Sequence, residues 1–183
     1  MIGLIKGKAS IKLNNRIPNG SDQFKRMKIK LLVVGKTDDQ HLEKLILTYQ
    51  KRLQHYISFE IEVIPDLKNS KHLSQAQQQQ KEGALILTKL SSSDQLVLLD
   101  EKGTAFRSIE FAHYLQKKMN SGIKQLVFAI GGPFGFSQDV YAKAMGKVSC
   151  SKMTFSHQMI RLFVVEQLYR GFTILRNEPY HHE

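Results

Sequence analysis

The sequence predicts an α/β fold with a mostly parallel sheet flanked by helices. Apolar runs of strand length alternate with segments of helical apolar period from residue 27 to the end of the chain. The run Ile29–Val34 is apolar except at Lys30, as expected for a strand that is covered on both faces. Because the 183 residues contain no internal repeat and no linker, we expect one domain of this class.

The first half of this domain predicts two strands and two helices. Ile29–Val34 is an apolar run closed by Gly35, and Phe59–Ile64 is a second strand. Between them, apolar residues recur at helical spacing over 42–53. The next helix is predicted over 73–90, and its glutamine run, Gln77–Gln80, is interpreted as a solvated face. The predicted apolar face of this helix is Leu73, Ala76, Gln80, Gly83, Leu87 and Leu90.

The middle of the domain predicts one more strand and helix. Gln95–Leu99 is the third strand, and Asp100–Gly103 is expected to be a turn. Ser108 is expected to cap a helix. Asn120-Ser121-Gly122 is expected to end that helix.

The last third continues the alternation. Gln125–Ile130 is the fourth strand, and it leads directly into the glycine-rich loop Gly131–Gly135. Ser137 is expected to cap a short helix. A short strand near Val148 follows, and a long helix begins near Ser156. The complete pattern is that of a single α/β domain.

The composition is that of an ordinary globular protein except for its charge. Apolar residues make up 42% of the chain and charged residues 23%. No stretch approaches the roughly 20 apolar residues of a membrane-spanning helix, so no membrane partner is expected. The single cysteine is typical of a reducing cytoplasm, since it can form neither an intramolecular disulfide nor a CxxC zinc site. The net charge of +11 favours a polyanionic partner such as nucleic acid.

Almost half of this charge lies in residues 1–26, which carry +5 against +6 for residues 27–183. The segment 1–26 has no clear apolar period and lacks the apolar core of a secretory signal. We interpret 1–26 as a basic N-terminal extension outside the fold, with Met27 as the natural start. The alternative is that residues 1–26 form a basic arm that binds RNA.

Three loops leave the carboxyl ends of predicted strands, at 99–103, 131–137 and 150–156. In open parallel sheets ligands bind at that edge, so these loops are the candidate site. Glycines at Gly131–Gly135 would let a ligand approach the backbone, but the spacing matches neither a phosphate loop nor a dinucleotide fingerprint. A tight turn without a ligand is the alternative. Cys150 is expected to be a small core or pocket-wall residue.

The helix predicted from about Ser156 is apolar nearly all round. Such a helix must be buried in a large core or against another chain, which favours a homodimer through this C-terminal helix. His157 and Arg161 interrupt the apolar pattern four residues apart, so they share a face. Glu166 and Arg170 have the same spacing, and a helix-surface ion pair is their simplest explanation.

The chain ends with an aromatic residue and two histidines, Tyr180, His181 and His182. Adjacent histidines can bind metal, but no further ligand set at suitable spacing accompanies them, so no metal site is expected. Tyrosine and histidine can also stack on or hydrogen-bond to an RNA base. A frayed terminus is the alternative.

Five segments in order resemble one family: Leu98–Gly103, Gly131–Gly135, Ser151–Arg161, Glu166–Arg170 and Pro179–His182. Together they resemble the ribosomal large-subunit pseudouridine N3-methyltransferases of the SPOUT, or trefoil-knot, class. The resemblance covers essentially all of residues 27–183, and residues 1–26 have no counterpart in it. It implies S-adenosylmethionine as methyl donor and N3 of a pseudouridine in 23S rRNA of the assembled ribosome as acceptor.

The resemblance also implies a homodimer with a C-terminal trefoil knot that forms the cofactor pocket. The apolar pattern alone does not predict a knot, because chains rarely thread through themselves. Carried over by motif, the cofactor contacts are Leu99, Gly131, Cys150, Ser151, Lys152, Met153, Thr154 and Phe155.

Methylation of N3 requires removal of its proton, so a base or a water route is needed. His157, His181 and His182 are the candidate bases, because imidazole groups exchange protons near neutral pH. Arg161 is a further catalytic candidate, since it could stabilise charge that develops on the base. Arg161, Arg170 and Tyr180 are the candidate RNA contacts.

Two other functions are compatible with the charge and the glycine loop. One is a non-catalytic ribosome- or RNA-binding α/β protein, explained by charge alone. The other is an enzyme that uses a different nucleotide at the glycine loop.

Overall fold

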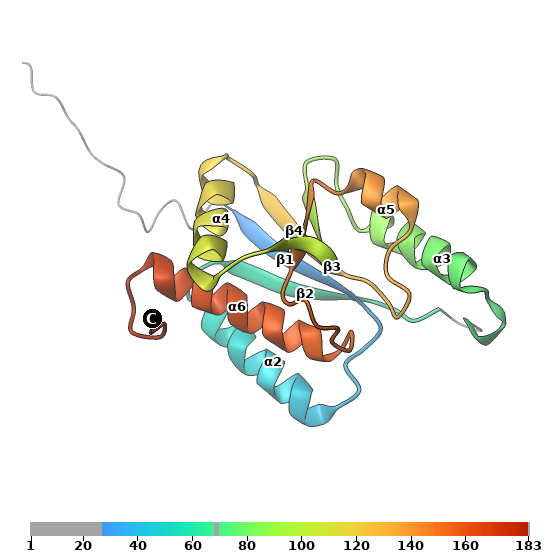
Figure 1. The fold of residues 1–183 in the computed structure, drawn as a ribbon, viewed down its shortest axis with the longest axis horizontal. Coiled ribbons are helices and arrows are strands. Elements are labelled where there is room, and N and C mark those ends of the chain that lie inside the picture. The colour runs from blue at the N-terminus through green and yellow to red at the C-terminus, as the bar shows by residue number, and fades with distance from the viewer. Residues whose placement is uncertain (1–26, 68–69, 183) are drawn as a thin grey trace, which may run out of the picture.

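The computed structural model describes residues 27–67 and 70–182, so the interpretation of 1–26 as an extension lies outside the described residues. Within them, five strands form one sheet in the order β2-β1-β4-β3-β5, and every neighbouring pair is parallel (Figure 1). The α/β prediction is confirmed. The elements are β1 (Lys28–Val34), α2 (Gln40–Leu53), β2 (Ser58–Ile64), the 3-10 turn η1 (Ser70–His72), α3 (Gln75–Thr88), β3 (Gln95–Ala105), α4 (Ser108–Asn120), β4 (Gln125–Ile130), α5 (Gln138–Lys143), β5 (Gly146–Ser149) and α6 (Met159–Leu175).

The sheet is covered on both faces, as the continuous apolar runs predicted. Along β1, Ile29 and Leu31 belong to the core beneath α2, α4 and α6. Leu32 and Val34 belong to a second core with α3 and α5. Successive strand residues point to opposite faces, so burial on both faces makes Leu31–Val34 apolar at every position.

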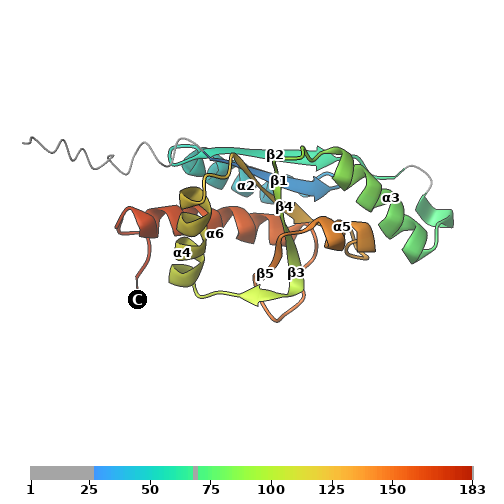
Figure 2. The ribbon, with the colours of Figure 1, turned by 90° about the horizontal axis from the view of Figure 1, so that it is seen from above.

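The third strand is longer than the sequence predicted. The residues expected as a turn, Asp100–Gly103, continue β3, which pairs with β5 at Val97–Leu99 and again at Thr104–Ala105. Gly103 permits this, because a Cβ there would lie 2.6 Å from the backbone of Val148. Figure 2 shows β3 and β5 running together away from the rest of the sheet. The turn-forming residues therefore make a β-bulge rather than a turn.

Two helix starts also differ from the prediction. Ser108 is the first residue of α4 rather than its cap. The cap is Arg107, whose backbone N–H donates a 2.8 Å hydrogen bond to the Glu110 side chain. The last helix begins at Met159, not near Ser156, and the Ser156 hydroxyl accepts a hydrogen bond from the Met159 N–H at 3.2 Å. The prediction for Ser137 is confirmed, since its side chain caps α5.

The predicted face of α3 holds in its second half, where Gly83 is buried and Leu87 and Leu90 pack on the core, but not in its first half. Ala76 and Gln80 are exposed, and Glu82, Gly83 and Ile86 are buried. The start of the helix carries few apolar residues, so the apolar period could not fix the face there.

The last helix is buried mainly by contacts within the chain. It lies against α2 and α4 (Figure 1), and Val165, Leu168 and Phe172 are fully buried. Met159 and Phe163 remain 41% and 38% exposed. An exposed apolar strip is therefore left at the start of α6. No helix of the described residues is long and apolar enough to cross a lipid bilayer.

Candidate functional site

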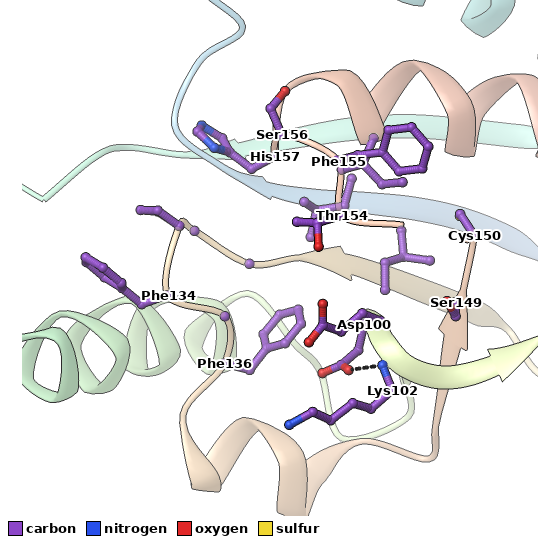
Figure 3. A pocket seen from close by; sticks show the side chains of 18 of the residues that line it. Asp100, Lys102, Phe134, Phe136, Ser149, Cys150, Thr154, Phe155, Ser156 and His157 are labelled. Atoms are coloured by element: carbon purple, nitrogen blue, oxygen red, sulfur yellow. Dashed lines mark hydrogen bonds between the residues drawn. The ribbon is translucent and has the colours of Figure 1, made fainter. Parts of the chain in front are cut away.

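The carboxyl ends of β4 and β5 and the irregular middle of β3, Leu99–Lys102, open into one pocket of about 750 Å³. Its walls are Leu99–Lys102, Ile130–Phe136 and Val148–Ser151 with Met153–His157, so the three predicted loops do converge. Figure 3 shows side chains from these loops around a shared space, with Thr154 and Asp100 on opposite sides of it. Gln79, Gln138, Tyr141 and Ile160 complete the lining.

The glycine loop folds back on itself at the pocket wall. The Gly135 N–H donates to the Gly132 carbonyl oxygen at 3.1 Å, and Gly135 has a φ of +78°. A Cβ on Gly131 would lie 3.0 Å from the Gly135 carbonyl oxygen. This close backbone packing requires glycine, and it leaves backbone atoms at the pocket surface.

The loop before α6 is held by short-range contacts. The Ser149 hydroxyl donates to the Ser151 carbonyl oxygen at 2.8 Å, and the Met153 N–H donates to the Ser151 hydroxyl at 2.9 Å. The Phe155 ring packs on the Phe163 ring with centroids 4.9 Å apart. These contacts fix the course of the loop on the way to His157.

The Asp100 carboxylate lines the pocket on the side of β3, and two hydrogen bonds fix its position. Its Oδ2 accepts a 2.5 Å hydrogen bond from the Tyr141 hydroxyl, and its Oδ1 accepts one from the Lys102 N–H at 2.7 Å. Burial raises the pKa of Tyr141 to about 12, and the bond to Asp100 adds to the rise. Tyr141 therefore acts as a hydrogen-bond donor that orients this carboxylate.

The pocket brings together most of the residues that the resemblance implied. Lys152 is exposed and does not line it. Gln79 and Tyr141 do line it, and sequence reasoning missed both. Gln79 was placed on a solvated face, but its side-chain amide donates to the Phe134 carbonyl oxygen. The residues brought together are Leu99, Gly131, Cys150, Ser151, Met153, Thr154 and Phe155, with His157.

Arg161 is buried behind the pocket, with 2% of its surface exposed. Its guanidinium donates to the carbonyl oxygens of His157 and Val34 at 3.0 and 2.7 Å, and to the Thr37 hydroxyl at 2.9 Å. Burial lowers the pKa of this guanidinium, while the nearby carboxylates of Asp66 and Asp38 raise it.

A second contact joins the same two segments. The Gln158 side chain donates to the Asp38 carboxylate at 2.7 Å and accepts from the Asp38 N–H at 2.9 Å. Gln158 and Arg161 thus fix the start of α6, directly after the pocket loop, to the segment that follows β1.

The tail residues fold back from the end of α6 along the helix. The Tyr180 hydroxyl donates to Glu166 at 3.0 Å, and Arg170 donates to the same carboxylate at 2.7 Å. The Arg170 guanidinium lies 4.7 Å from the centre of the Tyr180 ring. We call Glu166, Arg170 and Tyr180 the tail cluster. His181 and His182 follow it and do not line the pocket of their own chain.

A family model described as "Predicted SPOUT methyltransferase" matches residues 27–181. The chain belongs to the SPOUT methyltransferase family. Relatives named ribosomal RNA large subunit methyltransferase H agree with this assignment. The chain is similar to the protein of Flavobacterium johnsoniae at 66% identity and to that of Parabacteroides distasonis at 61%; each match covers 86% of this chain and all of the relative. The Bacteroides thetaiotaomicron relative is 58% identical with the same coverage.

A methyltransferase needs a pocket for its methyl donor, and the pocket at the three loops is the candidate. The pocket volume of about 750 Å³ lies within the range of small-molecule binding sites. Leu99, Ile130 and Phe136 provide apolar walls, and the glycine loop provides backbone polar groups. These features fit S-adenosylmethionine. Among the described residues no three histidine, cysteine, aspartate or glutamate side chains group as metal ligands do.

Proposed function

We propose that this protein is an S-adenosylmethionine-dependent methyltransferase acting on N3 of a pseudouridine in 23S rRNA of the assembled ribosome, in the cytoplasm. The observation that carries the proposal is the pocket formed by three loops, walled by backbone at Gly131 and Gly132. The relatives' names support ribosomal RNA as the substrate class. The trefoil knot implied by the resemblance belongs to the same proposal.

When bound, S-adenosylmethionine supplies a methyl group attached to a positively charged sulfur. The residues of Cys150–Phe155 and the glycine loop would hold the donor, and much of the acceleration would come from positioning it in line with N3. His157 lines the pocket and is the nearest candidate to take the N3 proton. Gln158 binds Asp38 directly after His157, and Arg161 binds the His157 carbonyl oxygen, so they orient His157 without contacting RNA.

The tail histidines would act through a second copy of the chain. α6 has 17 residues and is therefore about 25 Å long. His157 precedes one end of it, and His181 and His182 follow the other. A homodimer through α6 would bring one tail to the other pocket. The exposed apolar residues Met153, Met159 and Phe163 support such an interface near the pocket.

Within this arrangement the tail cluster would set the position of the tail. Arg170 is bound to Glu166 and packed on Tyr180, so its charge faces the cluster. Tyr180 would present His181 and His182 to the second pocket. RNA contacts by Arg170 and Tyr180 remain part of the proposal.

Binding and transfer test the function in two steps. Calorimetry should detect S-adenosylmethionine and S-adenosylhomocysteine binding, and labelled methyl should then transfer to assembled ribosomes that lack the modification. RNA binding without donor binding would support a non-catalytic binder instead. Binding of ATP or NAD in place of the donor would support a different enzyme.

Mixing two inactive variants tests whether the tail of one copy acts in the pocket of the other. One variant ends at Pro179, and the other carries Gly132→Val to disrupt the pocket wall, because a Cβ there would lie 2.3 Å from the Glu82 side chain. If tails and pockets act between copies, the mixed sample should recover part of the activity that each variant lacks. Absence of any recovery in mixed dimers, verified by sedimentation, would contradict the shared site.

A further inference from the structure

Glu82 is a buried carboxyl group on α3 with one unsatisfied oxygen. The residue is 3% exposed. Its Oε1 accepts a 2.7 Å hydrogen bond from the Gln78 side chain. Its Oε2 is shielded from solvent and has no hydrogen-bond partner among the residues that the structure describes. Buried carboxyl groups are normally paired, so this oxygen needs an explanation beyond packing.

The unsatisfied oxygen faces the back of the pocket wall. A Cβ on Gly132 would lie 2.3 Å from Glu82 Oε2, and Gly132 lines the pocket. One glycine backbone therefore separates the carboxyl group from the pocket. Gly131–Phe136 contains no ionisable side chain, so the wall carries no charge that could neutralise Glu82.

Tight contacts on either side keep Glu82 in place. A Cβ on Gly83 would lie 2.1 Å from the Ser137 hydroxyl oxygen, so α3 meets the start of α5 without an intervening side chain. Gln79 binds the Phe134 carbonyl oxygen, and Gln80 donates to Asp139 at 2.7 Å. The carboxyl group is consequently fixed relative to the pocket wall.

We propose that Glu82 is a positioning residue that determines ligand specificity, because its carboxyl group behind Gly132 favours the positively charged methyl donor over the uncharged product. This inference rests on the proposed use of S-adenosylmethionine. The donor carries a sulfonium, whereas S-adenosylhomocysteine has a neutral thioether at the same place. In a poorly solvated site a nearby carboxylate stabilises a cation strongly and leaves a neutral group almost unaffected. Glu82 thereby promotes exchange of product for fresh donor.

The preference for the methyl donor over the product should depend on whether the Glu82 carboxyl group is protonated. Burial raises the pKa of Glu82, the Gln78 hydrogen bond lowers it in part, and the charge of Asp66 raises it again. Asp139 of α5 is a further acid next to α3, and it accepts a hydrogen bond from Gln80. A cation in the pocket favours the carboxylate, so donor binding should release a proton where Glu82 is protonated in the free protein.

Calorimetry on the full chain tests the proposal. The dissociation constants of S-adenosylmethionine and S-adenosylhomocysteine are measured for wild type, Glu82→Gln and the control Glu43→Gln, which removes an exposed charge on α2. We expect Glu82→Gln to reduce the preference for the donor by about threefold to tenfold, and Glu43→Gln to leave it unchanged. If Glu82→Gln weakened the binding of both ligands equally, Glu82 would have only a structural role and the proposal would be overturned. Failure of wild type to bind either ligand would instead overturn the proposed function.

A second measurement needs no variant. Wild-type binding is measured in buffers of different ionisation enthalpy from about pH 5 to about pH 8. Other ionisable side chains that line the pocket include Asp100, Glu101, Lys102 and His157, and they are present in both measurements. We expect S-adenosylmethionine to release more protons than S-adenosylhomocysteine. Equal proton exchange at every pH would overturn the proposal even if Glu82→Gln did not fold.

Discussion

The Arg161 guanidinium donates a 2.7 Å hydrogen bond to the carbonyl oxygen of Val34, the last residue of β1. The sequence indicated Arg161 as a candidate catalytic residue and RNA contact, because a guanidinium can bind phosphate or stabilise charge that develops on the base. In the structure it is 2% exposed and joins the start of α6 to the end of β1. Its proposed role is therefore to position the pocket loop that precedes α6.

Arg161→Ala should lower the free energy of unfolding by about 2–4 kcal/mol, because it leaves buried acceptors without a donor. It should also weaken donor binding, since the loop before α6 loses its anchor. Urea unfolding and calorimetry measure the two effects. If Arg161→Ala kept the stability and donor affinity of wild type but lost methyl transfer, Arg161 would have a direct role in catalysis instead.

Gly103→Ala should separate β3 from β5. The new methyl group would lie 2.6 Å from the Val148 backbone, which cannot move aside as a side chain can. We expect a loss of about 2 kcal/mol or more in unfolding free energy. Gly146→Ala on β5 is the matched control, because no atom lies within 4 Å of its Cβ position. Equal stability of the two variants, measured by urea unfolding, would contradict the observed strand pairing.

Removal of the residues after Pro179 should abolish methyl transfer and leave donor binding intact. The tail does not line the pocket of its own chain, so its loss should spare donor binding. It removes the two histidines proposed to act in the second pocket and the Tyr180 contacts that place them. Tyr180→Phe is the milder test, since it removes only the hydroxyl that donates to Glu166. Normal turnover by the truncated protein would exclude the tail from catalysis.

Alkaline pH should destabilise the fold through Tyr141 and Tyr114. Burial raises the pKa of each phenol to about 12, from about 10 when unfolded, and the bond to Asp100 contributes at Tyr141. The folded state therefore retains these protons longer, and the stability they contribute is lost as the pH rises from about 10 through about 12. Absorbance of ionised tyrosine and circular dichroism should change together over this range. Tyr141→Phe should reduce the pH dependence of the unfolding free energy.

The sequence predicted the sheet because burial on both faces leaves a clear signal. Ile29–Val34 and Gln125–Ile130 could be recognised from their apolar residues alone. The convergence of the three loops followed as well, since carboxyl ends of parallel strands meet at one edge.

The parts that escaped prediction depend on contacts between distant segments. Asp100–Gly103 has turn residues, yet pairing with β5 extends the strand through them. Gln79 and Glu82 are polar, so the apolar period of α3 did not indicate that they lie at the pocket wall. Only the packing of α3 on the glycine loop shows this. The burial of Arg161 depends on the loop after β1, more than 120 residues earlier in the chain.

The most direct test of the proposed function is mass spectrometry of 23S rRNA from cells in which this gene is deleted and then restored. N3-methylpseudouridine should disappear on deletion, return with the wild-type gene, and stay absent with the gene truncated after Pro179. Persistence of the methylated base in the deleted strain would contradict the proposed function.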